Sequence, residues 1–207
     1  MSKTKIAVLV SGGGTNLQAL IDAQNSGKLV SGEIALVISN KEGAYALTRA
    51  ANAKIPAVTI LKKNFASAKD FEEAILSELR EHRIELIVLA GFLSILSADF
   101  TSQYPNRILN VHPSLIPAFC GAGFYGLRVH EAALAYGVKV TGATVHYVNE
   151  VPDGGEIILQ QAVKIRRGDT PEILQKRVME QAEWSILPRA TELVAKKLKK
   201  SVKEKNK

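Results

Sequence analysis

The chain has 207 residues, of which 46% are hydrophobic and 23% are charged. These values are ordinary for a soluble globular protein with a sizeable core, organised as one large domain or at most two. No apolar run approaches the roughly 18 residues that a membrane-spanning helix needs. The single cysteine, Cys120, cannot form an internal disulfide. Because no secretory signal pattern is present either, the composition predicts a cytoplasmic protein without a membrane partner.

The net charge of +7 is concentrated at the C-terminus. Residues 196–207 contain seven lysines and one glutamate, which account for a net +6. We therefore predict a single domain over residues 1–195 and a basic, disordered tail over residues 196–207. Since the charge is not spread over a face of the domain, no nucleic-acid partner is expected.

The first half of the sequence alternates between strands and helices. Continuous apolar runs predict strands that are buried on both faces, and apolar residues at helical spacing predict the helices between them. The predicted strands are Ile6–Val10, Ile34–Ile38, Ala57–Ile60, Leu86–Ala90 and Ile108–Val111, and the predicted helices cover residues 17–27, 44–53 and 67–82. This alternation predicts an α/β fold with a Rossmann-like, doubly wound, mostly parallel sheet.

The second half predicts an antiparallel extension of that sheet. Lys139–Val148 and Ile157–Ile165 have the pattern of strands, and the loop between them contains Pro152 and two glycines. This arrangement favours a long antiparallel hairpin. Thr170 and Pro171 then open a final long helix, with the threonine at the N-cap and the proline at the first helical position.

A glycine-rich segment, Ser11–Asn16, lies between the first strand and the first helix. Glycines let backbone N–H groups approach an anion, and a helix N-terminus adds partial positive charge. The segment is neither a Walker loop nor a dinucleotide fingerprint, because no Gly-Lys-Ser/Thr follows and Leu17 occupies the third glycine position. The pattern favours a site for a phosphate monoester, and the alternative is a tight strand–helix turn.

Asn110 and His112 end an apolar strand and lie two residues apart, so their side chains share one face. An amide that stabilises an oxyanion, next to a ring that can give or take a proton, can perform acyl transfer. Asp153 lies in a turn downstream, and a carboxylate near His112 would raise the pKa of that ring. The alternatives are a polar strand end that binds turn backbone, and an ordinary Asp-Gly-Gly turn.

The other histidines and the cysteine predict no further chemistry. His146 lies on a strand and is expected in the core or in support of the site, whereas His82 and His130 lie on helical segments and are expected on the surface. No His or Cys cluster has the spacing of a metal site, so no metal is expected. The surroundings of Cys120 show no sign of an activated thiol.

Together these motifs resemble those of the phosphoribosylglycinamide formyltransferases, a family of folate-dependent enzymes. The resemblance covers about residues 5 to 195, and its motifs are Val8–Leu17, Ser39-Asn40, Leu89–Phe92, Asn110–Pro117, Thr144–Val148, Asp153–Gly155 and Ile158–Gln160. The Asn-x-His-Pro-Ser-Leu motif with a downstream aspartate is shared by folate formyltransferases, and the Ser-Gly-x-Gly-x-Asn loop narrows the resemblance to this family.

The resemblance implies transfer of the formyl group of 10-formyltetrahydrofolate to the amine of glycinamide ribonucleotide, in de novo purine biosynthesis. It implies small-molecule substrates, no metal, and a monomer or homodimer. Two alternatives stay open, a formyltetrahydrofolate hydrolase-like enzyme and a catalytically silent phosphoribosyl- or folate-binding module. A methionyl-tRNA formyltransferase would use the same chemistry but is expected to carry a further C-terminal nucleic-acid-binding domain.

The resemblance also assigns residues to roles. The implied catalytic residues are Asn110, His112 and Asp153; the implied ribonucleotide-binding residues are Gly14, Thr15, Asn16 and Glu183; and the implied folate-binding residues are Leu93, Ser94, Ile95, Leu96, Asn110, Asn149, Glu150, Val151, Pro152 and Asp153.

Three features of the sequence depart from the family. Ser94 and Ala68 stand where the family usually has arginine, so different contacts to the glutamate tail of the folate are expected. The loop over residues 118–127 is longer than in the shortest members. Phe124 or Tyr125 covers the site in one interpretation, and the loop is purely structural in the other.

Overall fold

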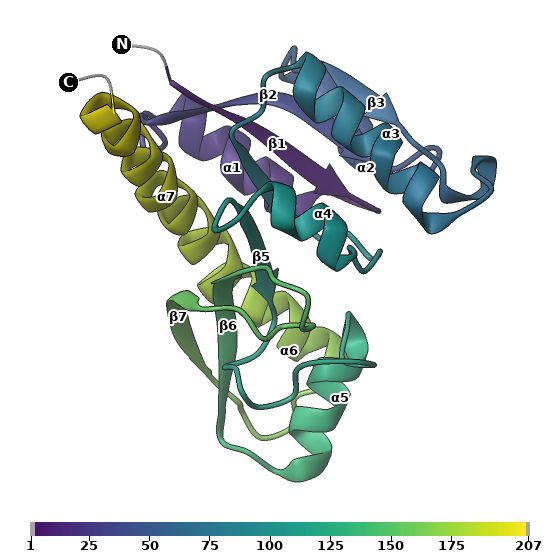
Figure 1. Ribbon diagram of the computed structural model, residues 1–207. Coiled ribbons are helices and arrows are strands. Elements are labelled where there is room, and N and C mark those ends of the chain that lie inside the picture. The colour runs from purple at the N-terminus through teal and green to yellow at the C-terminus, as the bar shows by residue number, and fades with distance from the viewer. Residues whose placement is uncertain (1–2, 206–207) are drawn as a thin grey trace.

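The computed structural model describes residues 3–205, with the side chains of residues 3–200. Seven strands form one sheet in the order β3-β2-β1-β4-β5-β6-β7 (Figure 1). The strands are β1 Thr4–Val10, β2 Gly32–Ser39, β3 Ala57–Thr59, β4 Leu86–Leu89, β5 Ile108–His112, β6 Val140–Tyr147 and β7 Ile157–Lys164. Strands β1, β2, β3, β4 and β5 are parallel to one another, β6 pairs with β5 in the antiparallel direction, and β7 pairs with β6 in the same way. The predicted α/β sheet and its antiparallel hairpin are confirmed.

Helices connect the strands and cover both faces of the sheet. They are α1 Thr15–Asn25, α2 Tyr45–Asn52, the 3-10 turn η1 Lys62–Asn64, α3 Ala68–Glu81, α4 Ala98–Gln103, α5 Leu127–Tyr136, α6 Pro171–Val178, the π-helical turn η2 Met179–Glu183 and α7 Trp184–Lys205. Over the described part of the chain, no helix combines the length and apolar character that crossing a bilayer requires.

Strand β1 is buried on both faces because its apolar residues run without a break. Ile6, Val8 and Val10 pack into one core with residues of α1, α2 and α7, while Ala7 and Leu9 pack into the other with α3 and α4. All five side chains are 0% exposed. Burial on both faces holds the end of β1 rigidly, and the glycine-rich segment begins directly after it.

The strand order places the candidate motifs at one edge of the sheet. From β1 the chain moves outward to β2 and β3, and then returns to β4 on the other side of β1. Ligands of such sheets bind at the carboxyl ends of the strands, where the order reverses. Ser11–Asn16 follows the carboxyl end of β1, and Asn110 and His112 lie at the carboxyl end of β5. The fold therefore brings both motifs to the same edge.

The C-terminal segment differs from the single long helix that the sequence predicts. Thr170 caps α6 as expected, since its side chain accepts a hydrogen bond from the Ile173 N–H, and Pro171 follows at the first helical position. The π-helical turn η2 then separates α6 from α7. Such turns insert an extra residue and re-aim the side chains that follow, often at functional sites. Here the turn ends at Glu183, which lies buried in the interior.

The predicted disordered tail begins as helix. Helix α7 continues to Lys205, and Leu198 packs against the core that contains Ile6, Val8 and Val10. Lysine and leucine are good helix formers, so the segment extends a helix that is already anchored. Residues 206–207 of the predicted tail lie outside the described residues.

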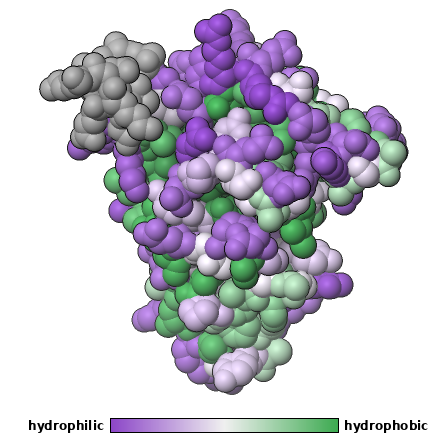
Figure 2. Space-filling view, in the orientation of Figure 1, coloured by the Kyte–Doolittle hydropathy of each residue, from purple (hydrophilic) through white to green (hydrophobic). Residues whose placement is uncertain are grey.

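Hydrophilic side chains dominate the upper part of the face in Figure 2, and hydrophobic residues reach the surface more often in the lower part, over β6, β7 and α5. Large exposed side chains of these elements include Tyr136, Val140 and Ile157. The surface thus becomes more apolar toward the antiparallel end of the sheet.

The close pairing of β6 with β7 generates a stability prediction at Gly142. A Cβ atom there would lie 2.0 Å from the backbone oxygen of Gln161 and 2.8 Å from Cδ2 of Leu115. Gly142→Ala should lower the free energy of unfolding by about 1–3 kcal/mol, because the strands must separate to admit the methyl group. Urea denaturation measures this change. Gly12→Ala is the control, since a Cβ there meets nothing within 4 Å. Equal losses in the two variants would contradict the prediction.

Candidate active site

A cavity of about 660 Å³ opens at the carboxyl edge of the sheet. It gathers most of the residues that the sequence singles out. These are Asn16, Leu93, Ser94, Ile95, Leu96, Asn110, His112, Asn149, Glu150, Val151, Pro152, Asp153 and Glu183. Gly14 and Thr15 do not line it, and Thr15 instead lines a neighbouring groove between α1 and the start of α7.

The ring of His112 is held at both nitrogens. Strand β5 pairs with β4 on one side and β6 on the other, which fixes the backbone of Asn110 and His112. Nε2 of His112 lies 2.8 Å from the carbonyl oxygen of Phe119, and Nδ1 lies 3.4 Å from Oδ2 of Asp153. The side chain is 5% exposed. A fixed strand and two polar partners therefore set the orientation of this ring.

Asp153 is the residue on which the other polar groups converge. Oδ2 accepts a hydrogen bond from the Gly121 N–H at 2.9 Å, and it also faces His112. Oδ1 lies 3.4 Å from Nδ2 of Asn110 and 3.5 Å from Nε2 of His146. The backbone of Asp153 has a φ of 56°, an uncommon conformation for a residue other than glycine. Such strain persists where the surroundings enforce it, often at a functional site.

The surroundings of Asp153 favour its charged form. Burial raises the pKa of this carboxyl, but the hydrogen bonds from His146 and the Gly121 N–H, together with the charge of His112, hold it below its usual range. A carboxylate that accepts several hydrogen bonds retains its charge even when partly buried. Asp153 is therefore ionised at neutral pH.

The pKa of His112 does not shift in the direction that the sequence predicts. Burial lowers the pKa of His112, and this effect outweighs the charge of Asp153 and the Phe119 carbonyl, which both raise it. His146 lowers it further. The expectation of a raised pKa is wrong because it counted the carboxylate and left out the loss of hydration. The charge of Asp153 therefore limits how far burial lowers the pKa of His112.

His146 orients the amide of Asn110. Nδ1 of His146 lies 2.7 Å from the carbonyl oxygen of Tyr147, which can only accept, so Nδ1 carries the proton. Nε2 lies 3.3 Å from Nδ2 of Asn110 and 3.5 Å from Oδ1 of Asp153, so one ring atom faces both the amide and the carboxylate. The amide orientation follows from this network. His146 is 1% exposed, which confirms the expected supporting position. The amide nitrogen of Asn110 also donates to Oδ1 of Asp153 at 3.4 Å.

His130 lies inside the same cavity rather than on the surface, so the sequence-based expectation is wrong. Its side chain is 0% exposed, and neither ring nitrogen has a hydrogen-bond partner among the described residues. Burial, together with the neighbouring His112, lowers the pKa of His130 to about 4. The buried neighbours Val129 and Ala133 on α5 are the signal in the sequence that could have placed it inside.

The N-terminus of α1 forms the other end of the site. Gly14 adopts a left-handed conformation with φ 70°, and the first helical hydrogen bond runs from the Gln18 N–H to its carbonyl at 2.9 Å. The N–H groups before Gln18 have no partner within the helix. No acidic residue lies in this first turn. The partial positive charge of the helix end is therefore available to an anion.

Asn16 and Glu183 connect the helix end to the cavity. Nδ2 of Asn16 donates to Oε2 of Glu183 at 2.7 Å, and Oδ1 of Asn16 is buried without a hydrogen-bond partner among the described residues. Burial raises the pKa of Glu183, and the hydrogen bond from Asn16 lowers it by less. A buried carboxyl with a raised pKa at the cavity wall is typical of a functional group.

The opposite wall of the cavity is apolar and more open. Leu93 and Ile95 are 68% and 76% exposed, respectively, and both line the cavity. The hydroxyl of Ser94 accepts a hydrogen bond from Nδ2 of Asn40 at 2.9 Å. Phe124 and Tyr125 also line the cavity, as one of the two interpretations of this loop predicts. An apolar wall with polar groups at one end fits a flat ligand that carries one reactive polar part.

The cysteine and the acidic side chains add no second chemical centre. Sγ of Cys120 lies 3.3 Å from the carbonyl oxygen of Pro117, and burial raises the pKa of this thiol, with the charge of Asp153 adding to the effect. The thiol is therefore protonated at neutral pH. The described side chains include no group of three or more His, Cys, Asp or Glu residues placed to hold a metal ion.

Comparison with known proteins identifies relatives over nearly the whole chain. Residues 4–191 match the formyl transferase family. The chain is 46% identical over 184 residues to a phosphoribosylglycinamide formyltransferase from Haemophilus influenzae, which covers 89% of this chain and 84% of the relative. It is also 46% identical over 194 residues to the trifunctional purine biosynthetic protein adenosine-3 of Gallus gallus. That match covers 94% of this chain but 19% of the longer relative.

Solved structures agree with these relatives. Glycinamide ribonucleotide transformylase 1 from Symbiobacterium toebii superposes with a TM-score of 0.88 at 41% identity, covering 94% of this chain and 88% of that one. A phosphoribosylglycinamide formyltransferase from Brucella melitensis has a TM-score of 0.85 at 40% identity, covering 94% and 96% of the two chains.

The buried His130 generates a prediction about stability and pH. Its pKa is about 4 in the folded protein and about 6.5 when unperturbed, so between these values the unfolded chain binds a proton that the folded chain does not. This destabilisation is absent above pH 6.5, grows as the pH falls, and reaches about 3 kcal/mol near pH 4. His130→Leu should abolish it, so the stability difference between variant and wild type should increase from pH 7 to pH 4.

Urea denaturation at a series of pH values measures this difference. His82→Leu, at the C-cap of α3, is the control for loss of a histidine elsewhere. Parallel pH profiles for wild type and His130→Leu would contradict the prediction.

Proposed function

The chain belongs to the formyl transferase family, and we propose that it transfers the formyl group of 10-formyltetrahydrofolate to the amine of N1-(5-phospho-D-ribosyl)glycinamide. The products are formylglycinamide ribonucleotide and tetrahydrofolate, in cytoplasmic de novo purine biosynthesis. The observation that supports this most strongly is the convergence of Asn110, His112 and Asp153 in a cavity that Glu183 also lines.

The two ends of the site suit the two substrates. The phosphate of the ribonucleotide would bind at the N-terminus of α1, and its glycinamide amine would lie near Glu183. The pterin ring would lie between the segments 93–96 and 149–153, against the exposed side chains of Leu93 and Ile95. This placement brings amine and formyl carbon together beside Asn110.

Asn110 and His112 would stabilise negative charge on the formyl oxygen. The co-substrate supplies an activated formyl group, and the neutral amine attacks its carbon to form the new C–N bond. The amide of Asn110, which donates to Oδ1 of Asp153 at 3.4 Å, would turn this N–H to the formyl oxygen as charge develops there. His112 would donate as well, and for this the formyl oxygen must compete with the Phe119 carbonyl that now lies 2.8 Å from Nε2.

Asp153 and His112 would move the protons that the reaction requires. After attack the amine nitrogen is positively charged and must lose a proton, and Asp153 is an ionised base beside His112. The folate nitrogen gains a proton as its bond to the formyl carbon breaks, and protonated His112 would supply it. One proton leaves the amine and one reaches the leaving nitrogen, so no covalent enzyme intermediate is needed.

Removal of an oxyanion donor should reduce turnover far more than substrate binding. Asn110→Ala should lower kcat by about 10²–10³ with a small change in KM, because the lost hydrogen bond matters most in the transition state. His112→Ala should have an effect of similar size. The change in folate absorbance measures both. Asn52→Ala, at the exposed end of α2, is the control. Wild-type turnover in either site variant would contradict the proposed roles of Asn110 and His112 in formyl transfer.

The same assay separates the alternatives. Product that forms only when both substrates are present supports the transferase. Product without the ribonucleotide indicates a hydrolase, and no product with either mixture indicates a binding module.

The role of Asp153 predicts a change in the titration of His112. The Asp153 charge raises the pKa of His112 against the effect of burial, so Asp153→Asn should lower that pKa below the wild-type value. His112 should then be protonated only at more acidic pH. NMR titration of the histidine ring signals measures the shift, and the signals of His82, at the C-cap of α3, provide an internal control. An unchanged pKa of His112 would remove the electrostatic role of Asp153.

A further inference from the structure

Helix α2 holds the glycine-rich loop that precedes α1 through hydrogen bonds. The Ala46 N–H donates to the Gly12 carbonyl at 3.1 Å, and Nε of Arg49 donates to the Gly13 carbonyl at 2.8 Å. A Cβ atom on Gly14 would lie 2.6 Å from Cβ of Ala46, so the loop and helix are in close contact. Two successive carbonyls of the loop are thus bound by α2.

The binding of these carbonyls matters because of their charge. A carbonyl oxygen carries partial negative charge, and a loop binds an anion only when its N–H groups rather than its carbonyls face the anion. Arg49 holds the Gly13 carbonyl through a charged donor, which is a stronger bond than a neutral one. The side chain therefore fixes the loop conformation and offsets the partial charge of one of its carbonyls.

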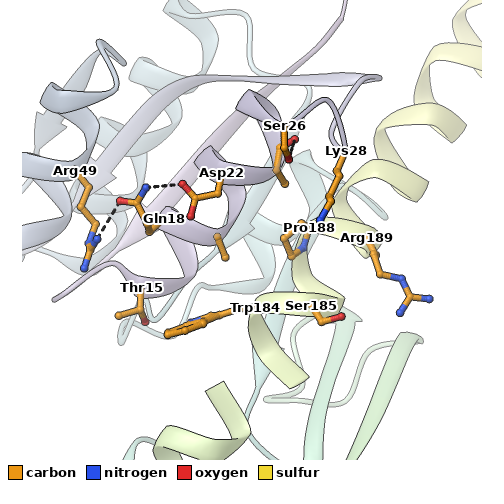
Figure 3. Close-up of a pocket in the computed structure, with 12 residues that line it drawn as sticks. Thr15, Gln18, Asp22, Ser26, Lys28, Arg49, Trp184, Ser185, Pro188 and Arg189 are labelled. Carbon is orange, nitrogen blue, oxygen red and sulfur yellow. Dashed lines mark hydrogen bonds between the residues drawn. The ribbon is translucent and has the colours of Figure 1, made fainter. Parts of the chain in front are cut away.

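The guanidinium of Arg49 is itself held in place. Nη1 donates to Oε1 of Gln18 at 3.0 Å, and the guanidinium carbon lies 4.9 Å from the centre of the Tyr45 ring. Nε2 of Gln18 in turn donates to Oδ1 of Asp22 at 2.9 Å, so a chain of hydrogen bonds runs along α1 (Figure 3). Such a fixed, planar cation can act on the loop in a way that a flexible lysine cannot.

Arg49 also lies beside the N-terminus of α1, at a groove on the surface. It lines a groove of about 610 Å³ together with Thr15, the first residue of α1. Nη2 has no hydrogen-bond partner among the described residues. The first turn of α1 contains no acidic residue that would cancel the charge of Arg49 there.

From these contacts we propose that Arg49 is a positioning residue for the substrate's phosphate. It holds the Gly13 carbonyl away from the anion and adds a positive charge beside the loop over residues 12–16. The inference rests on the proposed function for the identity of the substrate. It goes beyond that function by assigning phosphate recognition to a residue of α2 outside the glycine-rich motif.

Kinetics with two substrates test whether Arg49 acts through the phosphate. Arg49→Met should raise KM for glycinamide ribonucleotide by about tenfold or more, with a much smaller change in kcat. The same variant should change kcat/KM for the dephosphorylated glycinamide riboside by less than about twofold. Arg49→Lys keeps the charge but loses the planar pair of donors, so it should recover part of the loss. Equal losses on both substrates, or no loss on either, would overturn the proposal.

Arg107→Met is a matched control variant. Arg107 also lies over a tyrosine ring, 5.0 Å from the centre of Tyr104, and donates to a backbone carbonyl, that of Gln103. It lines neither the cavity nor the groove. Its replacement should leave KM for both substrates unchanged. Thermal unfolding of Arg49→Met and Arg107→Met shows whether either substitution unfolds the protein, and Arg49→Lys covers the case in which the methionine variant does.

A binding measurement tests the proposal without catalysis. The single tryptophan, Trp184, lines the groove with Thr15, and Figure 3 shows the two side chains next to each other. Titration with inorganic phosphate at constant ionic strength should change Trp184 fluorescence, with weaker apparent affinity in Arg49→Met than in wild type. No response in wild type, or equal affinities, would overturn the role of Arg49. Absent formyl transfer with an Arg49-dependent phosphate response would instead refute the proposed function alone.

Discussion

The geometry of the site depends on the carboxylate of Asp153. A buried charge is stable only when hydrogen bonds and opposite charges replace its hydration. Asp153 meets this requirement by binding the Gly121 N–H and by facing His112 and Asn110. These partners come from the loop before α5 and from β5, while Asp153 itself lies between β6 and β7. The contacts that stabilise this one charge therefore hold three distant parts of the chain together, despite the unfavourable φ of 56° at Asp153.

The same requirement explains how the histidines behave as a group. His112 and His146 face the Asp153 carboxylate, and His130 lines the same cavity, so a positive charge on one ring opposes protonation of its neighbour. Burial keeps His112 and His130 hard to protonate, and Asp153 offsets this for His112, its direct partner. When negative charge forms on a substrate oxygen nearby, it acts in the same direction as Asp153. In the proposed reaction, His112 would then gain a proton when a donor is needed, without being permanently charged.

The sequence predicts those parts of this structure that depend on local pattern. A continuous apolar run such as Ile6–Val10 fits a strand buried on both faces, and the spacing of Asn110 and His112 places them on one face. The sequence does not predict the features that depend on packing between distant segments. Apolar periodicity does not reveal the extra residue that widens η2, and it does not show that α5 lies against α6 and buries His130. Asp153 is an intermediate case, because the sequence pattern left it open between a partner of His112 and an ordinary turn residue, and only the family resemblance implied its catalytic role.

Glu183 illustrates why the widened turn matters for the chemistry. The π-helical turn ends at Glu183, whose buried carboxyl binds Asn16 next to the glycine-rich loop. An ionised carboxylate beside the substrate's amine would hold it as an ammonium ion, which has no lone pair with which to attack. Burial raises the pKa of Glu183 and so favours the neutral acid. A neutral carboxyl can orient the amine by hydrogen bonds and leave its lone pair free. In the proposed reaction, the fold thus favours the ionised form of Asp153 and the neutral form of Glu183, and both carboxyls line the same cavity.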